Sequence, residues 1–346
     1  MRAHAAGTAQ ADNKTDLFCL FLLFFRRIST SFTLSTHWKN YDVFSRQKIK
    51  TFRSSRPAAI ELAARYREIV TQLQKEAKEA ALDKEHEEAQ KILFFEMLEI
   101  CLWGNATDLS LLTNLTYEDI QKLQGSEARK ASEKNILAND LGAAHAALLQ
   151  ARREGRAERR VDIVLDNAGF ELYVDLILAG YLLSSGLATT VVLHPKTIPW
   201  FVSDVVPDDF AALLNALADP RTFYETPSDD EKLRGAAPPP PLSDAEAADL
   251  RFLFDEWGRH HAEGRLVLRP RQSWTWPGSY WRLPPLDPEL YEDLKASELV
   301  VFKGDLNYRK LTGDVSFTTP FPSHPVSILF FFSNFLFLVC SAALGR

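Results

Sequence analysis

The sequence predicts an α/β protein, a doubly wound three-layer α/β/α sheet domain with a helical N-terminal region. The first observation is a set of short runs rich in β-branched residues, which are typical of buried parallel strands. The second is the helical periodicity between these runs, since strands that alternate with helices favour a parallel sheet with helices on both faces. The predicted strands are Val161–Leu165, Thr189–Leu193, Arg265–Leu268 and Leu299–Phe302.

Composition limits the class of protein. The chain has 346 residues, of which 46% are hydrophobic and 25% charged, enough apolar material for one large core or two smaller ones. A net charge of -6 without a dense basic stretch argues against a nucleic-acid partner. Three widely separated cysteines form no CxxC pair, so we expect a reducing compartment, the cytoplasm and also the nucleus. The sequence indicates no oligomeric state.

Residues 26–155 are expected to form the helical region. A helix begins near Ser54, with Ser54 or Ser55 as its cap and Pro57 in its first turn. The charged stretch Lys75–Lys91 is typical of solvated helix faces. Further helices are expected at Ile92–Leu102, Tyr117–Leu123 and Ser132–Gln150.

Residues 156–314 are expected to form the α/β domain. Between its strands, apolar periodicity predicts helices, and a segment with four consecutive prolines predicts a surface loop. The expected helices are Gly169–Leu183, Asp208–Leu217 and Ala245–Ala262, and the loop is Glu225–Ser243.

The two ends differ from the rest. Residues 1–25 contain the apolar run Leu17–Phe25 without the basic start of a signal peptide. Residues 315–346 form an apolar tail in which Val326–Leu344 is long enough for a transmembrane helix. Because Ser and Asn interrupt that run, we favour a tail that is not native coding sequence over a membrane anchor. A membrane partner is expected only if the tail is an anchor.

Polar side chains follow three of the predicted strands, at the edge where open α/β sheets bind ligands. Asp166 and Asn167 follow the first strand and offer hard oxygen ligands that suit Mg²⁺ or Mn²⁺. The next helix can hold a phosphate at its N-terminus. The alternative is that Asp166 or Asn167 only caps that helix, and residue spacing favours neither interpretation.

The second grouping follows Thr189–Leu193. Asp204 is placed to complete a metal site, and Lys196 to attract a phosphate. Taken alone, Asp204 is more simply a turn or cap residue, and His194 is more often a packed histidine than a ligand. The third grouping follows Leu299–Phe302, where Arg309 offers a bidentate phosphate contact. The alternative there is a polar surface turn.

Several segments together resemble one family, the metal-dependent damage-control phosphatases, in the subfamily that includes a proposed acidic-residue methyltransferase. The resemblance covers about Arg26 to Asp314, in the right order. The signature segments are Leu165–Leu183, His194–Val205 and Phe302–Asp314, with similar helical segments at Trp38–Tyr66 and Leu98–Leu112.

The resemblance implies a divalent metal, Mn²⁺ or Ni²⁺ and also Mg²⁺ or Co²⁺, on Asp166, Asn167 and Asp204. It implies small sugar-phosphate substrates such as fructose 1-phosphate and fructose 6-phosphate, and S-adenosylmethionine contact at Glu171. The implied fold is an α/β/α sandwich with a helical N-terminal region. The positions implied to contact the substrate are Asp305, Leu306, Asn307, Tyr308 and Arg309.

We therefore expect metal-assisted hydrolysis of a phosphomonoester. Asp166, Asn167 and Asp204 hold the metal, and Asp305 orients the substrate or handles a proton. Arg309 and Lys196 bind the phosphate. The alternatives are a protein carboxyl methyltransferase that uses S-adenosylmethionine, and a truncated non-catalytic protein. The family's Arg-Thr-x-Lys motif, with its substrate-contacting lysine, does not occur in this chain.

Overall fold

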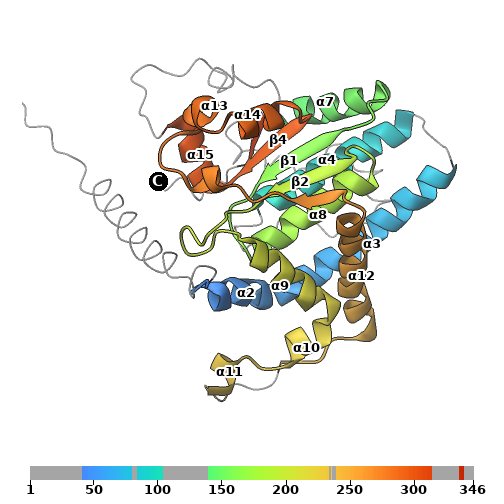
Figure 1. Ribbon diagram of the computed structural model, residues 1–346. Helices are drawn as coiled ribbons and strands as arrows, with labels where there is room; N and C mark the ends of the chain where they lie inside the picture. The colour runs from blue at the N-terminus through green and yellow to red at the C-terminus, as the bar shows by residue number, and fades with distance from the viewer. Residues whose placement is uncertain are drawn as a thin grey trace, which may run out of the picture.

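A parallel β-sheet lies at the centre of the protein. The computed structural model describes residues 41–79, 84–103, 139–233, 235, 239–313 and 335–338. Neighbouring strands are all parallel and follow the order β3-β2-β1-β4-β5 (Figure 1). The strands are β1 (Arg160–Val164), β2 (Thr190–His194), β3 (Leu266–Leu268), β4 (Leu299–Lys303) and β5 (Phe335–Leu338).

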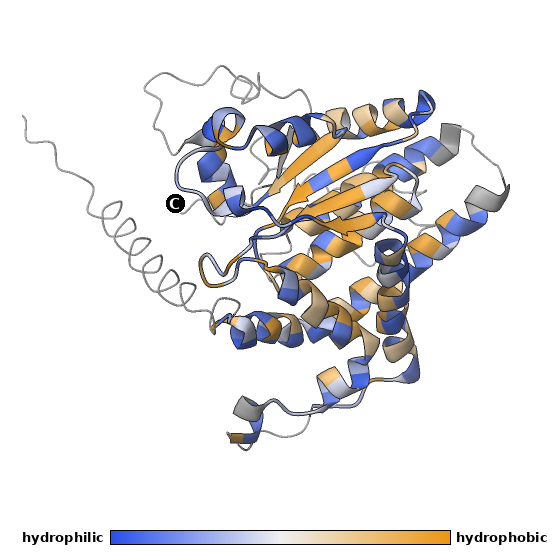
Figure 2. Ribbon diagram, viewed as in Figure 1, coloured by the Kyte–Doolittle hydropathy of each residue, from blue (hydrophilic) through white to orange (hydrophobic). Residues whose placement is uncertain are grey.

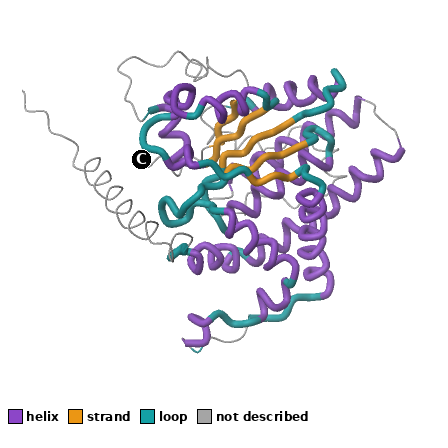
Figure 3. Tube along the Cα trace, viewed as in Figure 1, coloured by secondary structure: helices purple, strands orange, loops and turns teal. Residues whose placement is uncertain are grey.

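Helices cover both faces of this sheet, so the predicted doubly wound α/β/α fold with a helical N-terminal region is confirmed (Figure 3). One layer carries the larger core and the other carries the helices between β3 and β4 and after β4. The first layer comprises α2 (Ser45–Ser54), α3 (Arg56–Glu79), α4 (Lys84–Trp103), α7 (Leu141–Arg153), α8 (Phe170–Ser184), α9 (Pro207–Ala218), α10 (Pro220–Glu225) and α12 (Asp244–Ala262), while α11 (Asp229–Leu233) lies away from the sheet (Figure 1). The second comprises η2 (Gln272–Thr275), η3 (Tyr280–Arg282), α13 (Leu283–Leu286), α14 (Pro288–Lys295) and α15 (Gly304–Thr312).

Alternate residues of the central strands serve the two cores. In β4, Leu299 and Val301 pack in the larger core, and Val300 and Phe302 pack in the smaller one. This division follows from the two-residue period of a strand, which sends successive side chains to opposite faces. Figure 2 shows the strands and the inner helix faces as mainly hydrophobic. The next residue, Lys303, therefore falls on the face of the larger core.

The strand order reverses direction between β1 and β4. Starting at β1, the chain passes through α8 to β2 and then to β3, and it returns to the other side of β1 as β4. A crevice at the carboxyl ends of the strands is expected at such a reversal. The loops after β1 and β4 therefore meet at the edge where ligands bind in this class of fold.

The helical region agrees with its prediction in part. The helix expected from Ser54 is α3, which buries Leu62, Tyr66 and Ile69 along one face. A separate helix, α2, precedes it; α2 lies in the segment Trp38–Tyr66 that resembles the family's helical part, but its bounds were not predicted. The helix expected at Ser132–Gln150 is α7, shorter at its start, and residues 132–138 lie outside the described residues together with Tyr117–Leu123.

Other differences lie in short, polar elements. The expected loop Glu225–Ser243 contains the short helix α11, and α14 and α15 were not predicted. In the apolar tail, Phe335–Leu338 form an edge strand beside β4 rather than part of a membrane-spanning helix. The other residues of Val326–Leu344 lie outside the described part. Among the described helices, none combines the length and the apolar character needed to cross a membrane.

Candidate active site

The predicted metal ligands come together at the carboxyl ends of β1 and β2. Asn167 and Asp204 form an antiparallel bridge. Backbone hydrogen bonds run from Val205 N to Asp166 O (2.9 Å) and from Ala168 N to Ser203 O (2.7 Å). The two loops are therefore paired like a short ribbon, which holds the three polar side chains close together. The first residue before α8 is Gly169 and the first before α9 is Val206, so none of the three predicted ligands caps a helix.

Asp166 is buried and pressed against the first residue of α15. A Cβ added at Gly304 would lie 1.9 Å from Asp166 Oδ2, and Gly304 has a φ of +81°. Both the space and the backbone conformation therefore require glycine at this position. Burial raises the pKa of Asp166 well above its usual value, and the neighbouring carboxylates of Glu171 and Asp204 raise it further. This is an environment in which a bound cation would be strongly stabilising.

Asn167 links the neighbouring side chains. Its Nδ2 donates to Asp166 Oδ2 and to Glu171 Oε2, both at 2.8 Å. Its Oδ1 accepts a hydrogen bond from Ser203 Oγ at 2.6 Å. The amide therefore joins two carboxylates that would otherwise repel each other. Burial also raises the pKa of Glu171, against the opposite effect of Lys303.

Asp204 presents one unsatisfied oxygen. Its Oδ2 accepts a hydrogen bond from Phe201 N at 2.9 Å. Its Oδ1 is buried without a hydrogen-bond partner, and the Lys196 ammonium is 3.9 Å away. Lys196 is fully buried and donates to the Leu165 carbonyl at 2.6 Å. A buried carboxylate oxygen without a donor is costly, which is expected where a ligand completes the site.

The predicted substrate segment forms α15. Asn307 is fully buried, and its Nδ2 donates to the Lys303 carbonyl at 2.8 Å. Its Oδ1 accepts from the Tyr280 hydroxyl at 2.7 Å, so this side chain ties α15 to η3. The remaining positions predicted to contact the substrate are partly exposed, and they are Asp305, Leu306, Tyr308 and Arg309.

His194 is a packed histidine, as the simpler interpretation held. It is fully buried, its Nε2 lies 2.7 Å from Asp162 Oδ1, and its ring meets that of Trp274 edge-on. Asp162 and His194 project to the second layer of helices, away from Glu171 on α8. They belong to the support of the sheet and not to the group of predicted ligands.

Several residues around the site were not predicted. Lys303 ends β4 and lies among buried acids, and burial opposes its charge while Asp175 and the other acids raise its pKa well above the usual value. Lys310 on α15 donates to the carbonyls of Trp274 and Trp276. Burial lowers its pKa to about 7, and the nearby charge of Lys196 contributes. The sequence carried one signal for the role of Lys303. This lysine directly follows the predicted buried strand Leu299–Phe302, and lysine is rarely buried unless it is paired.

The donor set fits a divalent cation in chemical kind. Carboxylate and amide oxygens are the ligands that Mg²⁺ and Mn²⁺ prefer. Asp204 Oδ1 is a buried acceptor that the protein leaves without a donor, and Asp166 is buried beside the carboxylates of Glu171 and Asp204. Across the described residues, no three His, Cys, Asp or Glu side chains are arranged as a metal-binding group. The predicted set contains two carboxylates and one amide, which is a different donor set.

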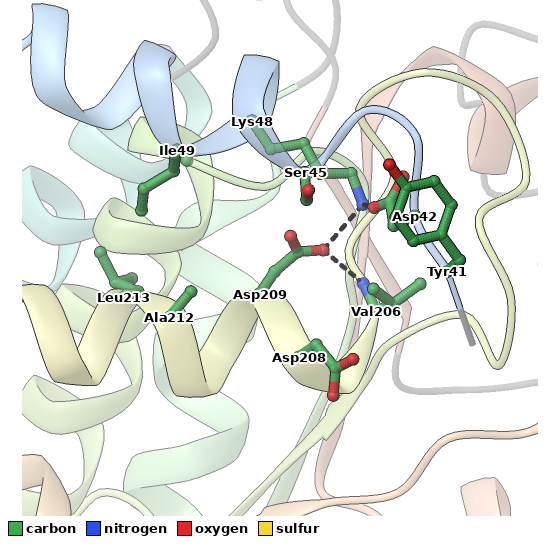
Figure 4. Close-up of a pocket in the computed structure, with 11 residues that line it drawn as sticks. Tyr41, Asp42, Ser45, Lys48, Ile49, Val206, Asp208, Asp209, Ala212 and Leu213 are labelled. Carbon is green, nitrogen blue, oxygen red and sulfur yellow. Dashed lines mark hydrogen bonds and ion pairs between the residues drawn. The ribbon is translucent and has the colours of Figure 1, made fainter. Parts of the chain in front are cut away.

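A cavity of about 310 Å³ adjoins this region between α2 and the start of α9. Figure 4 shows Lys48 pointing between Asp42 and Asp209, with its ammonium 2.6 Å and 2.8 Å from their carboxylates. Asp209 Oδ2 also accepts from Val206 N, which begins α9. The positive charge of Lys48 is therefore balanced by two carboxylates of the protein. Gly169 lines this cavity and also belongs to the loop after β1.

The sequence was compared with known proteins. The family model described as the damage-control phosphatase ARMT1-like domain matches residues 4–342. Damage-control phosphatase ARMT1 of Xenopus laevis is 34% identical over 305 residues, which are 86% of this chain and 60% of that protein. The human protein of that name is 34% identical over 303 residues, covering 87% and 60%, and the Danio rerio protein is 31% identical over 293 residues, covering 84% and 57%.

The matched range is wider than the signature segments, since it includes most of residues 1–25 and of the apolar tail. The chain spans about 60% of the length of the curated relatives it matches. With nearly its whole length matched by one family model, the chain belongs to the family of damage-control phosphatases with an ARMT1-like domain.

Proposed function

We propose that this protein is a metal-dependent phosphatase that hydrolyses small sugar phosphates such as fructose 1-phosphate and fructose 6-phosphate. The observation that carries the proposal is the bridge between Asn167 and Asp204, which pairs the loops after β1 and β2 and leaves Asp204 Oδ1 buried and unsatisfied beside Asp166. Family membership supports phosphatase chemistry, because the relatives are named damage-control phosphatases.

The proposed cation is Mn²⁺ or Ni²⁺, with Mg²⁺ or Co²⁺ as further candidates. Asp166, Asn167 and Asp204 would hold it. When bound, such a cation lowers the pKa of a water and offsets negative charge on a phosphoryl group. The two carboxylates supply the charge that retains it, and burial keeps competing water away from them.

The substrate is proposed to lie against α15, because this helix begins beside Asp166. Arg309 suits a phosphate because its planar guanidinium donates in pairs. Asp305 is in the first turn of α15, where it is proposed to orient a sugar hydroxyl or accept a proton. Lys196 is proposed to contribute positive charge from beneath the site. A hydrogen bond that its ammonium donates to the Leu165 carbonyl holds it there.

The test is release of phosphate from fructose 1-phosphate with and without Mn²⁺, with Asp166→Ala beside the wild type. We expect metal-dependent release that falls at least about 100-fold in the variant, because loss of a ligand exceeds the usual cost of losing an outer contact. Asp208→Asn is the matched control, since Asp208 is an exposed aspartate outside the proposed ligands. Equal release by wild type and Asp166→Ala would contradict the proposed function.

The methyltransferase alternative gains no support from Glu171. One of its carboxylate oxygens accepts from Asn167, and the other faces Lys303. Transfer of a labelled methyl group from S-adenosylmethionine to an acidic protein would be the result that favours it. Cytoplasmic and nuclear locations remain proposals, and fractionation of cells that express the full chain would test them.

A further inference from the structure

Buried polar contacts lie behind the proposed metal ligands, on the α8 side of the sheet. The Lys303 ammonium is 2.7 Å from Asp175 Oδ1, 2.8 Å from the Cys101 carbonyl and 3.3 Å from Glu171 Oε1. Two of these contacts are hydrogen bonds donated by the ammonium, to Asp175 and to the Cys101 carbonyl, and the contact with Glu171 is an ion pair. Lys303 is 2% exposed. It therefore faces the protein and not a substrate.

Glu171 connects this lysine to the proposed ligands. While Oε1 faces Lys303, Oε2 accepts a hydrogen bond from Asn167 Nδ2 at 2.8 Å. The same nitrogen donates to Asp166 Oδ2 at 2.8 Å. A carboxylate held at one oxygen has little freedom to rotate at the other, so the place of Lys303 sets the direction of the Asn167 amide.

The same group of side chains sets the charge of the site. Among the residues that are buried here, four carboxylates face two ammonium groups, a formal excess of two negative charges, which equals the charge of one divalent cation. Without Lys303 the excess would be three, and Asp175 would lose its ion-pair partner. The carboxylates are Asp166, Glu171, Asp175 and Asp204, and the ammonium groups are Lys196 and Lys303.

We propose that Lys303 is a positioning residue of the metal site: by fixing Glu171 it orients the Asn167 amide and, through Asn167, the Asp166 carboxylate. This role rests on the metal dependence proposed above. A purely electrostatic role for Lys303 leads to the opposite expectation, because loss of a nearby positive charge strengthens cation binding. The substitution Lys303→Met therefore separates the two roles.

The first experiment measures Mn²⁺ affinity by titration calorimetry on metal-free protein. We expect Lys303→Met to bind Mn²⁺ at least about tenfold more weakly than the wild type, as for other residues that orient metal ligands. Lys48→Met is the matched control, since Lys48 is buried and paired with two aspartates but makes none of these contacts. Its Mn²⁺ affinity should stay within about twofold of the wild type. Unchanged or tighter binding by Lys303→Met would overturn the positioning role.

A companion variant covers failure of Lys303→Met to fold. Lys303→Met combined with Asp175→Asn removes the carboxylate that is closest to Lys303, so only Glu171 loses an ion-pair partner, and Glu171 keeps its hydrogen bond from Asn167. The Glu171 contact is still lost, and we expect the same weakening of Mn²⁺ binding. Wild-type affinity in this double variant would also overturn the positioning role.

The second experiment needs no metal. Urea unfolding is measured for four metal-free proteins: the wild type, Lys303→Met, Asn167→Ala and the variant that carries both Lys303→Met and Asn167→Ala. Together they form a double-mutant cycle. Because both residues act on Glu171, we expect the double variant to lose less stability than the two single losses added together. Additive losses would overturn the positioning role. Failure of the wild type to bind Mn²⁺ would contradict only the proposed metal dependence, and the cycle would then decide the role of Lys303.

Discussion

Gly304 determines at the residue scale whether the site can form. It begins α15 with a φ of +81° and leaves no room for a Cβ beside Asp166. Positive φ alone costs a side-chain-bearing residue about 1–2 kcal/mol. In addition, a Cβ at this position would displace the carboxylate of Asp166, which is a proposed metal ligand. The two effects can be separated by comparison with another glycine of similar conformation.

We expect Gly304→Ala to weaken Mn²⁺ binding at least about tenfold, because its Cβ would displace the Asp166 carboxylate. Gly278→Ala is the matched control, since Gly278 has a φ of +90° but its Cβ would meet only Arg282, at 3.6 Å. Calorimetric titration with Mn²⁺ and the thermal midpoint of unfolding check both variants. Equal Mn²⁺ affinity in the two variants would show that the contact with Asp166 has no effect on the metal.

At the scale of elements, α12 combines a capping box with a charged patch in its last turns. Ser243 caps the helix and Glu246 reaches back to the Ser243 N–H. Further along, Glu256 lies 2.7 Å from Arg259 and 3.2 Å from His260. Burial raises the pKa of Glu256, but its contacts with His260 and Arg259 outweigh burial and lower it to about 2.

A carboxyl whose pKa is lowered by folding stabilises the protein fully at pH values above its unfolded-state pKa of 4.5. This stabilisation is lost as the pH falls through the folded-state pKa of about 2. We therefore expect Glu256→Gln to lower the free energy of unfolding by about 1–2 kcal/mol at pH 7, less than the full shift implies because solvent screens Arg259. Urea unfolding of both proteins between pH 7 and pH 2 checks this. A difference that stays constant over that range would contradict it.

The sequence predicted the elements whose residues share an apolar pattern. Leu299–Phe302 is a continuous apolar run, and it forms most of β4. α15 was missed because its only buried side chain is the polar Asn307, whose partners are the Lys303 and Val164 carbonyls and the Tyr280 hydroxyl. The bounds of α2 were not predicted for a similar reason, since its buried residues are only Lys48 and Phe52. Tertiary contacts, not local pattern, hold these helices.

For the candidate site, the strand ends placed Asp166 and Asp204 at one edge of the sheet, and the resemblance to the family implied that both are metal ligands. Parallel strands end at one edge, so polar residues that follow them meet there. The support behind the site could not be predicted in this way. The contact of Lys303 with Asp175 joins residues 128 positions apart, and its contact with Cys101 spans 202 positions. No sequence spacing indicates such partners.

At the scale of the whole molecule, the site joins loops from β1, β2 and β4, so a bound cation would connect distant parts of the chain. A ligand that binds only the folded state stabilises it, by about 2.7 kcal/mol at a concentration 100 times its dissociation constant. We expect Mn²⁺ to raise the thermal midpoint by several degrees and EDTA to reverse the rise. Asp204→Ala should show no such rise, and an equal rise in this variant would point to cation binding elsewhere.

The alternation of β4 has a consequence for which changes in chain length the protein tolerates. Phe302 points into the smaller core and Lys303 into the acids behind Asp166. Insertion or deletion of one residue within β4 would exchange these directions, placing an ammonium among aromatic rings and an aromatic ring among carboxylates. Indels in this strand should therefore be eliminated in a deletion-scanning library, even where single substitutions of Val300 or Val301 to other β-branched residues survive.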